Sequence, residues 1–314
     1  MGSLAKNNIK KEKTILNNGI EIPPIILGTA HPLHDKKLAQ GKGKICNCLI
    51  RIFYNKIYSK FLVLKQVVAI AGAIKMGYRA IDTSAAYGNE KFIKWGIKLS
   101  GIKRRELFIT TRVSNQQQWK GHIKKSLLES MRALGVDYVD LYMFHWPVTD
   151  VFIATWRQME SVYEEGLVKY IGVANCHQHH LEKLLAGALV VPAINQFEIH
   201  PLMTQKPLIA YCMSKGIAVE AYTPIGRNHE KLMRNDILKK LSKKYNKTIP
   251  QIILRWHYQN RIISVPRSTS FKHLKENLCI FNFELTPEEM KKIDSINTDL
   301  RLRYNPDDCD FNKL

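Results

Sequence analysis

Four ionisable side chains stand at or just after the ends of short apolar runs. Asp82 and Tyr87 lie in one segment, Arg112 is in the next apolar run, and His145 follows the run after that. A free phenol has a pKa near about 10, so a tyrosine releases its proton near neutrality only when a cation lies beside it. Taken singly, Asp82 and Arg112 fit a structural ion pair, and His145 with Trp146 fits ordinary core packing. Taken together, they are candidates for one catalytic site if the fold brings these ends together.

Apolar runs of strand length alternate with segments of helical period along most of the chain. The predicted strands are 25–27, 80–81, 107–110, 139–144, 170–173, 193–194, 218–221 and 262–265. Helical stretches between them include 123–134, 156–165, 179–185, 206–215 and 250–257. Eight strand–helix repeats without a linker rich in Gly, Ser or Pro predict an α/β fold, a (β/α)8 TIM barrel in which residues 1–314 form a single domain. Functional residues of such a barrel lie at the C-terminal ends of its strands.

An N-terminal β-hairpin is predicted ahead of the first strand. Residues 14–16 and 20–22 flank Asn17-Asn18-Gly19, and an Asn-Gly pair suits the positive φ angles of a tight turn.

Residues 34–65 interrupt the alternation of strands and helices and form a basic insertion after the first barrel strand. They carry eight basic residues against one acid, with four aromatic residues between them. Loops at this place in a barrel shape the mouth of the active site. The segment is expected to be a packed or solvated insertion, which either caps the pocket or folds as an extra helix on the barrel wall. The alternative is a surface that interacts with a partner, such as nucleic acid or a membrane.

Composition excludes several classes of protein. With 314 residues, 45% hydrophobic and 24% charged, the chain is neither disordered nor a disulfide miniprotein. The six cysteines are scattered, so we expect reduced thiols. We also expect no signal peptide and no transmembrane segment, and therefore a cytoplasmic protein. The formal charge of +21 attracts nucleic acid or phosphorylated molecules, but it also arises where Lys is the default surface residue.

Five segments carry motifs in a definite order. They are Gly77–Glu90 (GYRAIDTSAAYGNE), Leu141–Pro147 (LYMFHWP), Tyr170–Asn175 (YIGVAN), Asn195–Pro201 (NQFEIHP) and Ala221–Gly226 (AYTPIG). Together they resemble the aldo-keto reductase family, and the resemblance covers nearly the whole chain except residues 34–65 and the extreme termini. It implies an oxidoreductase that reduces an aldehyde, ketone or keto-sugar with NADPH, so the expected partner is a small carbonyl compound.

The resemblance also implies roles for the four ionisable residues. Tyr87 would be the general acid, and His145 with Trp146 would bind and orient the substrate. Asp82 would belong to the charge pair that tunes Tyr87. The family has a lysine where this chain has Arg112. Arginine keeps the positive charge, but its planar fork is bulkier than an ammonium and favours bidentate pairing, so the exchange is not conservative.

The resemblance places the cofactor contacts at several strand ends. NADP(H) is expected rather than NAD(H), because Arg267 can fork onto a 2′-phosphate, although His273 stands where a second arginine is common. Ala174 replaces a usual serine and removes one hydroxyl partner of the nicotinamide amide. The predicted cofactor-binding residues are Gly28, Thr29, Asp82, Asn175, Gln196, Tyr222, Thr223, Arg267, Ser268, His273, Glu276 and Asn277.

Two alternatives to a working reductase remain. In one, the chain is a catalytically impaired NADP-binding relative with a binding or regulatory role, because Arg112 replaces the lysine. In the other, the basic charge makes the barrel a nucleic-acid scaffold, but no recognition module supports this, and we expect no nucleic-acid partner. We expect no metal site either, because a surface helix start explains His177, His179 and His180 equally well.

Overall fold

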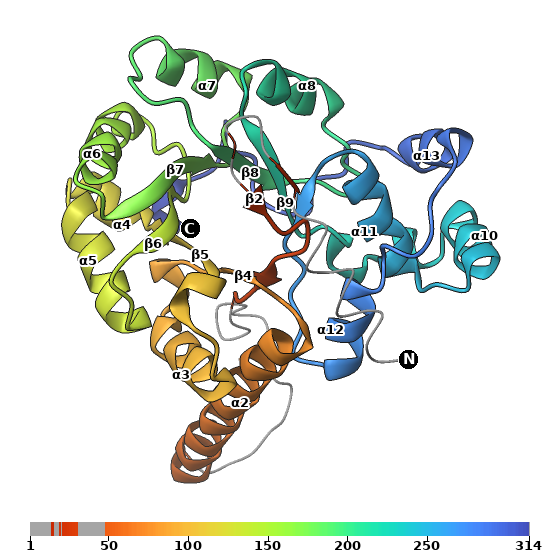
Figure 1. Ribbon diagram of the computed structural model, residues 1–314, viewed down its shortest axis with the longest axis horizontal. Coiled ribbons are helices and arrows are strands. Elements are labelled where there is room, and N and C mark those ends of the chain that lie inside the picture. The colour runs from red at the N-terminus through yellow and green to blue at the C-terminus, as the bar shows by residue number, and fades with distance from the viewer. Residues whose placement is uncertain (1–13, 16–18, 20, 31–47, 314) are drawn as a thin grey trace.

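Eight short parallel strands form the centre of the fold in this computed structural model (Figure 1). The structure describes residues 14–15, 19, 21–30 and 48–313, and for residues 14–15 and 48–60 it describes the backbone alone. The strands are β3 (Leu27–Gly28), β4 (Ala80–Asp82), β5 (Phe108–Val113), β6 (Val139–Phe144), β7 (Val168–Ala174), β8 (Ile194–Glu198), β9 (Ala218–Tyr222) and β10 (Ile263–Ser264). Each pairs with the next along the chain. Parallel bridges from Ile25 to Ser264 and from Gly28 to Arg267 join the first strand to the last, so the sheet closes on itself.

Helices follow the strands and form a ring around them (Figure 1). They are α2 (Cys48–Met76), α3 (Glu90–Ser100), α4 (Asn115–Trp119), α5 (Ile123–Leu134), α6 (Phe152–Glu164), α7 (Gln178–Leu185), α8 (Lys206–Ser214), α9 (Glu230–Met233), α10 (Asp236–Tyr245), α11 (Ile249–Gln259), α12 (Phe271–Leu278) and α13 (Pro287–Asp294). In α5 the buried positions are 123, 126, 127, 130, 131 and 134, which is the spacing of one helix face. Gly135 then ends α5 in the left-handed conformation, with φ of 67°.

Strand side chains alternate between two apolar layers. In β6, Leu141 and Met143 belong to a small cluster with Ile263, whereas Tyr142 and Phe144 belong to the larger cluster that includes the helices. The small cluster fills the barrel interior. Since the interior is packed with side chains, ligands must bind at an end of the barrel.

An antiparallel ribbon covers the N-terminal end of the strands. β1 (Thr14–Ile15) pairs with β2 (Glu21–Ile22). Ile22 is fully buried in the interior cluster beside Ala80 and Ala218, the first residues of β4 and β9. Leu16, Asn17, Asn18 and Ile20 of the predicted hairpin lie outside the described residues. The open end of the barrel is therefore the C-terminal one.

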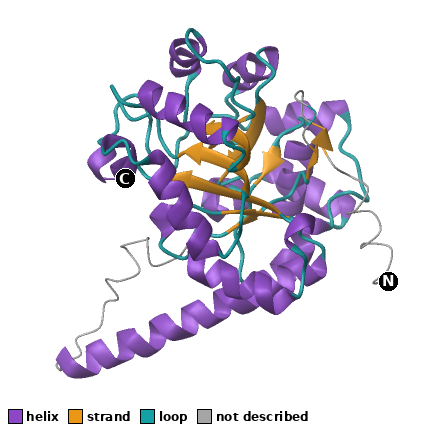
Figure 2. Ribbon diagram, turned by 60° about the vertical axis from the view of Figure 1, so that its left-hand side comes forward, coloured by secondary structure: helices purple, strands orange, loops and turns teal. Residues whose placement is uncertain are grey.

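The helix after the first strand is the longest in the described part of the chain. α2 spans 29 residues, and its second half packs against α3. Gly96 permits this approach, because a Cβ there would lie 2.7 Å from the Ile70 side chain. The other end of α2 extends away from the barrel (Figure 2). The described part of the predicted insertion, residues 48–65, is thus continuous with a barrel helix, and residues 34–47 lie outside the described ranges.

Membrane-spanning character is absent from the helices that the structure describes. None of them combines the length and the apolar character needed to cross a bilayer.

Candidate active site

The predicted acid–cation pair is buried at the C-terminal ends of two neighbouring strands. Asp82 is the last residue of β4, and Arg112 lies near the end of β5, which pairs with β4. The Arg112 guanidinium forms an ion pair with the Asp82 carboxylate and donates a hydrogen bond to the Thr83 carbonyl oxygen at 2.7 Å. Arg112 is fully buried, and Asp82 is 3% exposed. The fork of the guanidinium lets one side chain bond both partners at once.

Two further side chains extend this pair into a network across the barrel. Gln196 of β8 accepts a hydrogen bond from Arg112 at 2.7 Å through Oε1 and donates through Nε2 to Asp82 at 3.1 Å. The same Nε2 donates to the carboxylate of Glu220 on β9. Glu220 was not among the predicted site residues. A carboxylate inside the apolar run of residues 218–221 was the available signal, because buried charges need partners.

Burial and charge set the protonation states of this network. Burial raises the pKa of Glu220 to about 8, the charge of Asp82 acts in the same direction, and Arg112 opposes both. Burial lowers the pKa of Arg112, but the charge of Asp82, its hydrogen bond and the acidic groups of Tyr87 and Glu220 together outweigh burial, so the pKa is raised above its ordinary value. Arg112 therefore keeps its positive charge, while Glu220 holds a proton near neutral pH.

Tyr87 lies one short turn beyond Asp82. The 3-10 turn η2 (Ala85–Tyr87) starts at Ser84, whose Oγ accepts a hydrogen bond from the Ala86 amide, and ends at Gly88 with φ of 63°. This turn sets the Tyr87 ring edge-on to the His145 ring, with ring centroids 5.8 Å apart. Ser84 Oγ also forms a hydrogen bond with His145 Nδ1 at 3.3 Å. Ser84 thus orients the imidazole, a role that the sequence did not predict for it.

The pKa of the Tyr87 phenol is raised from its ordinary value. Burial is the largest cause, the positive charge of Arg112 lowers the pKa, and the charge of Asp82 raises it again. The phenol therefore stays protonated at neutral pH, which is the form that a proton donor requires. Arg112 is the strongest charge that opposes the effect of burial.

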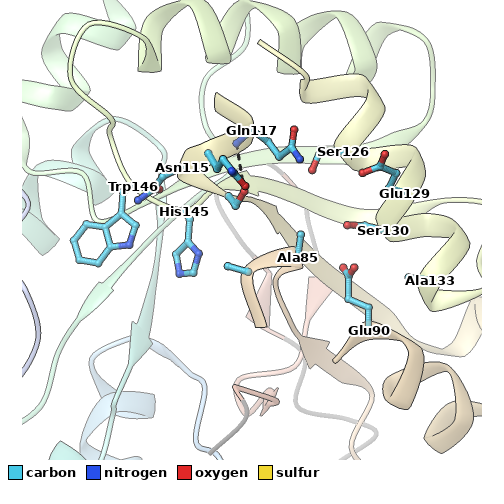
Figure 3. Close-up of a pocket in the computed structure, with 13 residues that line it drawn as sticks. Ala85, Glu90, Asn115, Gln117, Ser126, Glu129, Ser130, Ala133, His145 and Trp146 are labelled. Atoms are coloured by element: carbon cyan, nitrogen blue, oxygen red, sulfur yellow. Dashed lines mark hydrogen bonds between the residues drawn. The ribbon is translucent and has the colours of Figure 1, made fainter. Parts of the chain in front are cut away.

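A cavity of about 530 Å³ with a mixed polar and apolar lining lies beside His145 and Trp146 (Figure 3). Its wall comes from η2 and from residues of α3, α4 and α5, among them Glu90 and Asn115. Burial raises the pKa of Glu90, while hydrogen bonds from Thr111 and Ser130 oppose this. The Asn115 Oδ1 atom is buried without a hydrogen-bond partner among the described residues. The cavity therefore offers hydrogen-bond acceptors next to the histidine.

Gly28 and Thr29 lie in the barrel wall next to Asp82. Thr29 donates from Oγ1 to the Asp82 carbonyl oxygen at 2.8 Å. Its own carbonyl oxygen accepts hydrogen bonds from Gln66 and Asn89. A Cβ at position 28 would lie 3.1 Å from Val265, so the close approach of the first and last strands requires glycine there.

The predicted nicotinamide contacts lie at the C-terminal ends of β7, β8 and β9. Asn175 and Thr223 follow β7 and β9 with φ of 61° and 47°. This conformation is uncommon for the β-branched Thr223, whereas asparagine adopts it more readily. Asn175 donates to the His145 carbonyl oxygen at 2.9 Å. The Tyr222 hydroxyl and Thr223 Oγ1 are buried without hydrogen-bond partners among the described residues. Unsatisfied polar groups and strained backbone at one rim mark a ligand site.

The predicted phosphate and adenosine contacts lie at the last strand and on α12. Arg267 donates to the Ala30 carbonyl oxygen at 2.9 Å, and Ser268 forms a hydrogen bond with the Ser270 amide at 3.0 Å. His273 is exposed and Glu276 is half-buried. Asn277 is 5% exposed and forms a hydrogen bond with Tyr78, so it belongs to the packing between α12 and the barrel.

The C-terminal segment closes one side of the site. The backbone amides of Leu302 and Arg303 donate to the Glu198 carboxylate at 2.7 and 3.0 Å. Further along the chain, the ring centroids of Phe311 and Trp146 are 6.3 Å apart. No role was predicted for these residues, because their contacts join segments more than a hundred residues apart.

Comparison with known proteins agrees with this geometry. The model of the aldo/keto reductase family matches residues 64–298. Glyoxal reductase of Bacillus subtilis is 43% identical over 243 residues, which are 77% of this chain and 87% of that protein.

Two solved structures are similar over most of this chain. MGS-M4, an aldo-keto reductase from a deep-sea metagenome library of the Medee basin, has a TM-score of 0.82 and 34% identity, and the match covers 95% of this chain and 100% of that one. The aldo-keto reductase AKR2E4 of Bombyx mori, solved in complex with NADP, has a TM-score of 0.78 and 31% identity, with coverage of 94% and 96%. With its parallel strands, its buried charge pair and these matches, the chain belongs to the aldo/keto reductase family and is an oxidoreductase that acts on carbonyl groups.

Proposed function

We propose that the chain is an NADPH-dependent carbonyl reductase that converts a small aldehyde, ketone or keto-sugar into an alcohol. The observation that carries the proposal is the pairing of Tyr87 and His145 beside the buried Asp82–Arg112 ion pair. Similarity to a glyoxal reductase supports a small carbonyl substrate. Similarity to a structure in complex with NADP supports NADP(H) rather than NAD(H).

Each polar group has a distinct task in this proposal. NADPH supplies the hydride when it is bound. Tyr87 donates its proton to the substrate oxygen as negative charge develops there. Arg112 then stabilises the tyrosinate, while His145, held by Ser84, hydrogen-bonds and orients the carbonyl oxygen.

The residues of the rim fit the cofactor. Tyr222, Thr223 and Asn175 would hold the nicotinamide, where two buried hydroxyls lack partners within the described residues. Arg267 and the start of α12 would hold a phosphate, because a guanidinium and a helix N-terminus both favour anions. Gln196 already uses both ends of its amide within the charge network, so its contact with the nicotinamide would exchange one of these bonds.

A second candidate is an NADP-binding protein without efficient turnover. It is favoured by the three hydrogen bonds of Arg112, which hold the guanidinium toward Thr83, Asp82 and Gln196, and by the raised pKa of Tyr87. In this case the site binds the cofactor, but the phenol does not give up its proton during turnover.

Replacement of one hydroxyl group separates the two candidates. Tyr87→Phe removes the proton donor and retains the ring, and Tyr163→Phe, on the exposed face of α6, is the matched control. We expect the native chain and the control to consume NADPH with glyoxal, and Tyr87→Phe to lose about 10²- to 10⁴-fold in kcat, with NADPH binding unchanged by fluorescence. Undiminished turnover by Tyr87→Phe would contradict the proposal, and NADPH binding by an inactive native chain would favour the second candidate.

A further inference from the structure

A cluster of histidines lies away from the carbonyl site, at the start of α7. His177, His179 and His180 come from the segment after β7, and the C-terminal segment brings Asp307 against them. The ligand atoms of His179, His180 and Asp307 all lie within 4.8 Å of one another. The sequence shows the three histidines but not Asp307, which the fold alone brings to them.

We propose that His179, His180 and Asp307 form a binding site for a divalent transition-metal ion such as Zn²⁺. Imidazole nitrogens and a carboxylate oxygen are the donors that zinc prefers in a mixed site, and three protein ligands leave a position for water.

The distances between donor atoms carry the proposal. His179 Nε2 lies 3.4 Å from Asp307 Oδ1, and His180 Nδ1 lies 4.0 Å from the same oxygen. The second separation is too long for a hydrogen bond, and the first lies beyond the usual range of about 2.7–3.2 Å. Zinc–ligand bonds of about 2.0–2.1 Å place two ligand atoms of a tetrahedral ion about 3.4 Å apart. Of the three pairs of ligand atoms, His179 with Asp307 already has this spacing, His180 with Asp307 reaches it with a small shift, and His179 with His180 lies within 4.8 Å.

His177 gives the carboxylate its orientation. Its Nδ1 atom lies 2.8 Å from Asp307 Oδ2, so one carboxylate oxygen is held by a hydrogen bond and the other faces His179 and His180. Partners of this kind orient metal ligands in many sites. The His177 backbone amide donates to His180 Nδ1 at 3.1 Å, so coordination through that atom exchanges this hydrogen bond for a bond to the metal.

Charge and exposure act on the site in opposite ways. Arg301 lies 3.3 Å from His177 Nε2, and Lys183 acts on His180 as a further positive charge. These cations weaken the attraction for a metal ion, so we expect moderate affinity. The His179 and Asp307 side chains are 62% and 41% exposed, which leaves access from solvent.

The site joins the C-terminal segment to the barrel. Asp307 follows the residues that bind Glu198 and precedes Phe311, which lies against Trp146. A metal bound here therefore holds the segment that borders the mouth of the barrel.

Titration of the full-length apoprotein with Zn²⁺ at neutral pH tests the proposal. Asp307→Asn and His179→Gln each remove a proposed ligand. The matched controls are Asp308→Asn, which changes the neighbouring aspartate, and His122→Gln, which changes a histidine outside the cluster. A Cys309→Ser variant controls for the nearby thiol. We expect one ion per chain in the native protein and in all three controls, and a loss of affinity of about tenfold or more in the two ligand variants.

Two further readouts identify the ligands and the effect of the ion. Co²⁺ in the native chain should give the visible spectrum of a tetrahedral site without a thiolate charge-transfer band. Hydrogen exchange over residues 301–311 should slow when Zn²⁺ is added. Equal affinity of Asp307→Asn and Asp308→Asn, a thiolate spectrum, or no binding by the native chain would overturn the proposal and leave Asp307 as a hydrogen-bond partner only.

Discussion

At the scale of single residues, Arg112 is bonded to Asp82 and to Gln196, and Gln196 in turn is bonded to Glu220. Two carboxylates thus lie around one guanidinium inside the barrel. They cannot both be ionised at low cost, because burial penalises each charge and Arg112 neutralises only one. The raised pKa of Glu220 is the result.

The pH dependence of unfolding of a Glu220→Gln variant tests whether the pKa of Glu220 is raised in the folded protein. Since burial raises the pKa of Glu220 from 4.5 to about 8, the folded state binds its proton more tightly than the unfolded state. The stability gained in this way is complete below pH 4.5 and is lost as the pH rises through about 8. As the pH rises from 4.5 to about 8, we expect the urea midpoint of the native chain to decrease relative to that of Glu220→Gln. The glutamine variant keeps an acceptor for Gln196. Parallel pH dependences for the two proteins would contradict this.

The site residues differ in how far the sequence could predict them. Asp82, Tyr87, Arg112 and His145 were predicted, and the fold places all four at the C-terminal end of the barrel. Glu220 and Asp307 were missed for a physical reason. Asp307 contacts histidines more than a hundred residues away, and Glu220 feels the charges of Asp82 and Arg112 across a similar separation, although its hydrogen-bond partner Gln196 is 24 residues away. Spacing along one sequence carries no record of such contacts.

At the scale of elements, the predicted strands and helices followed from apolar periodicity, and β6 and α5 have the predicted bounds. An extra helix within residues 34–65 was one of the expectations, but a single helix α2 that runs on from Cys48 to Met76 was not predicted. Its second half packs on α3, whereas Phe61 and Leu64 farther out are more than half exposed. This exposed part of α2 has no buried face and therefore lacks the periodic apolar stripe that marks the other helices.

The contact between α2 and α3 predicts that a Gly→Ala substitution in a helix lowers the free energy of unfolding, which is the opposite of the usual effect. A glycine inside a helix normally costs stability, so Gly→Ala substitutions tend to stabilise. At Gly96 a Cβ would lie 2.7 Å from Ile70 and 3.1 Å from the Val67 carbonyl oxygen. We expect Gly96→Ala to lower the free energy of unfolding by about 1–3 kcal/mol. Gly187→Ala is the control, because nothing lies within 4 Å of its Cβ position. Chemical denaturation measures the change in the free energy of unfolding for both variants. Equal changes would show that α2 and α3 do not pack closely at Gly96.

At the scale of the whole molecule, eight parallel strands around a filled interior leave one end of the barrel for chemistry. The ribbon containing Ile22 covers the opposite end. A single domain over residues 1–314 stays a prediction, and an interaction surface on the basic segment 34–65 stays the alternative to a packed or solvated insertion. The net charge of +21 likewise has no assigned role, because Lys-rich surfaces arise without a specific partner.

The central claim is that Arg112 supports turnover in place of a lysine. The most direct test is the steady-state rate of NADPH consumption with glyoxal for the native chain and for Arg112→Lys, with NADPH binding measured on both. We expect the native chain to turn over, because its buried guanidinium retains its charge and is the strongest charge that lowers the pKa of Tyr87. The claim would be contradicted if Arg112→Lys turned over and the native chain did not, while both proteins bound NADPH equally well.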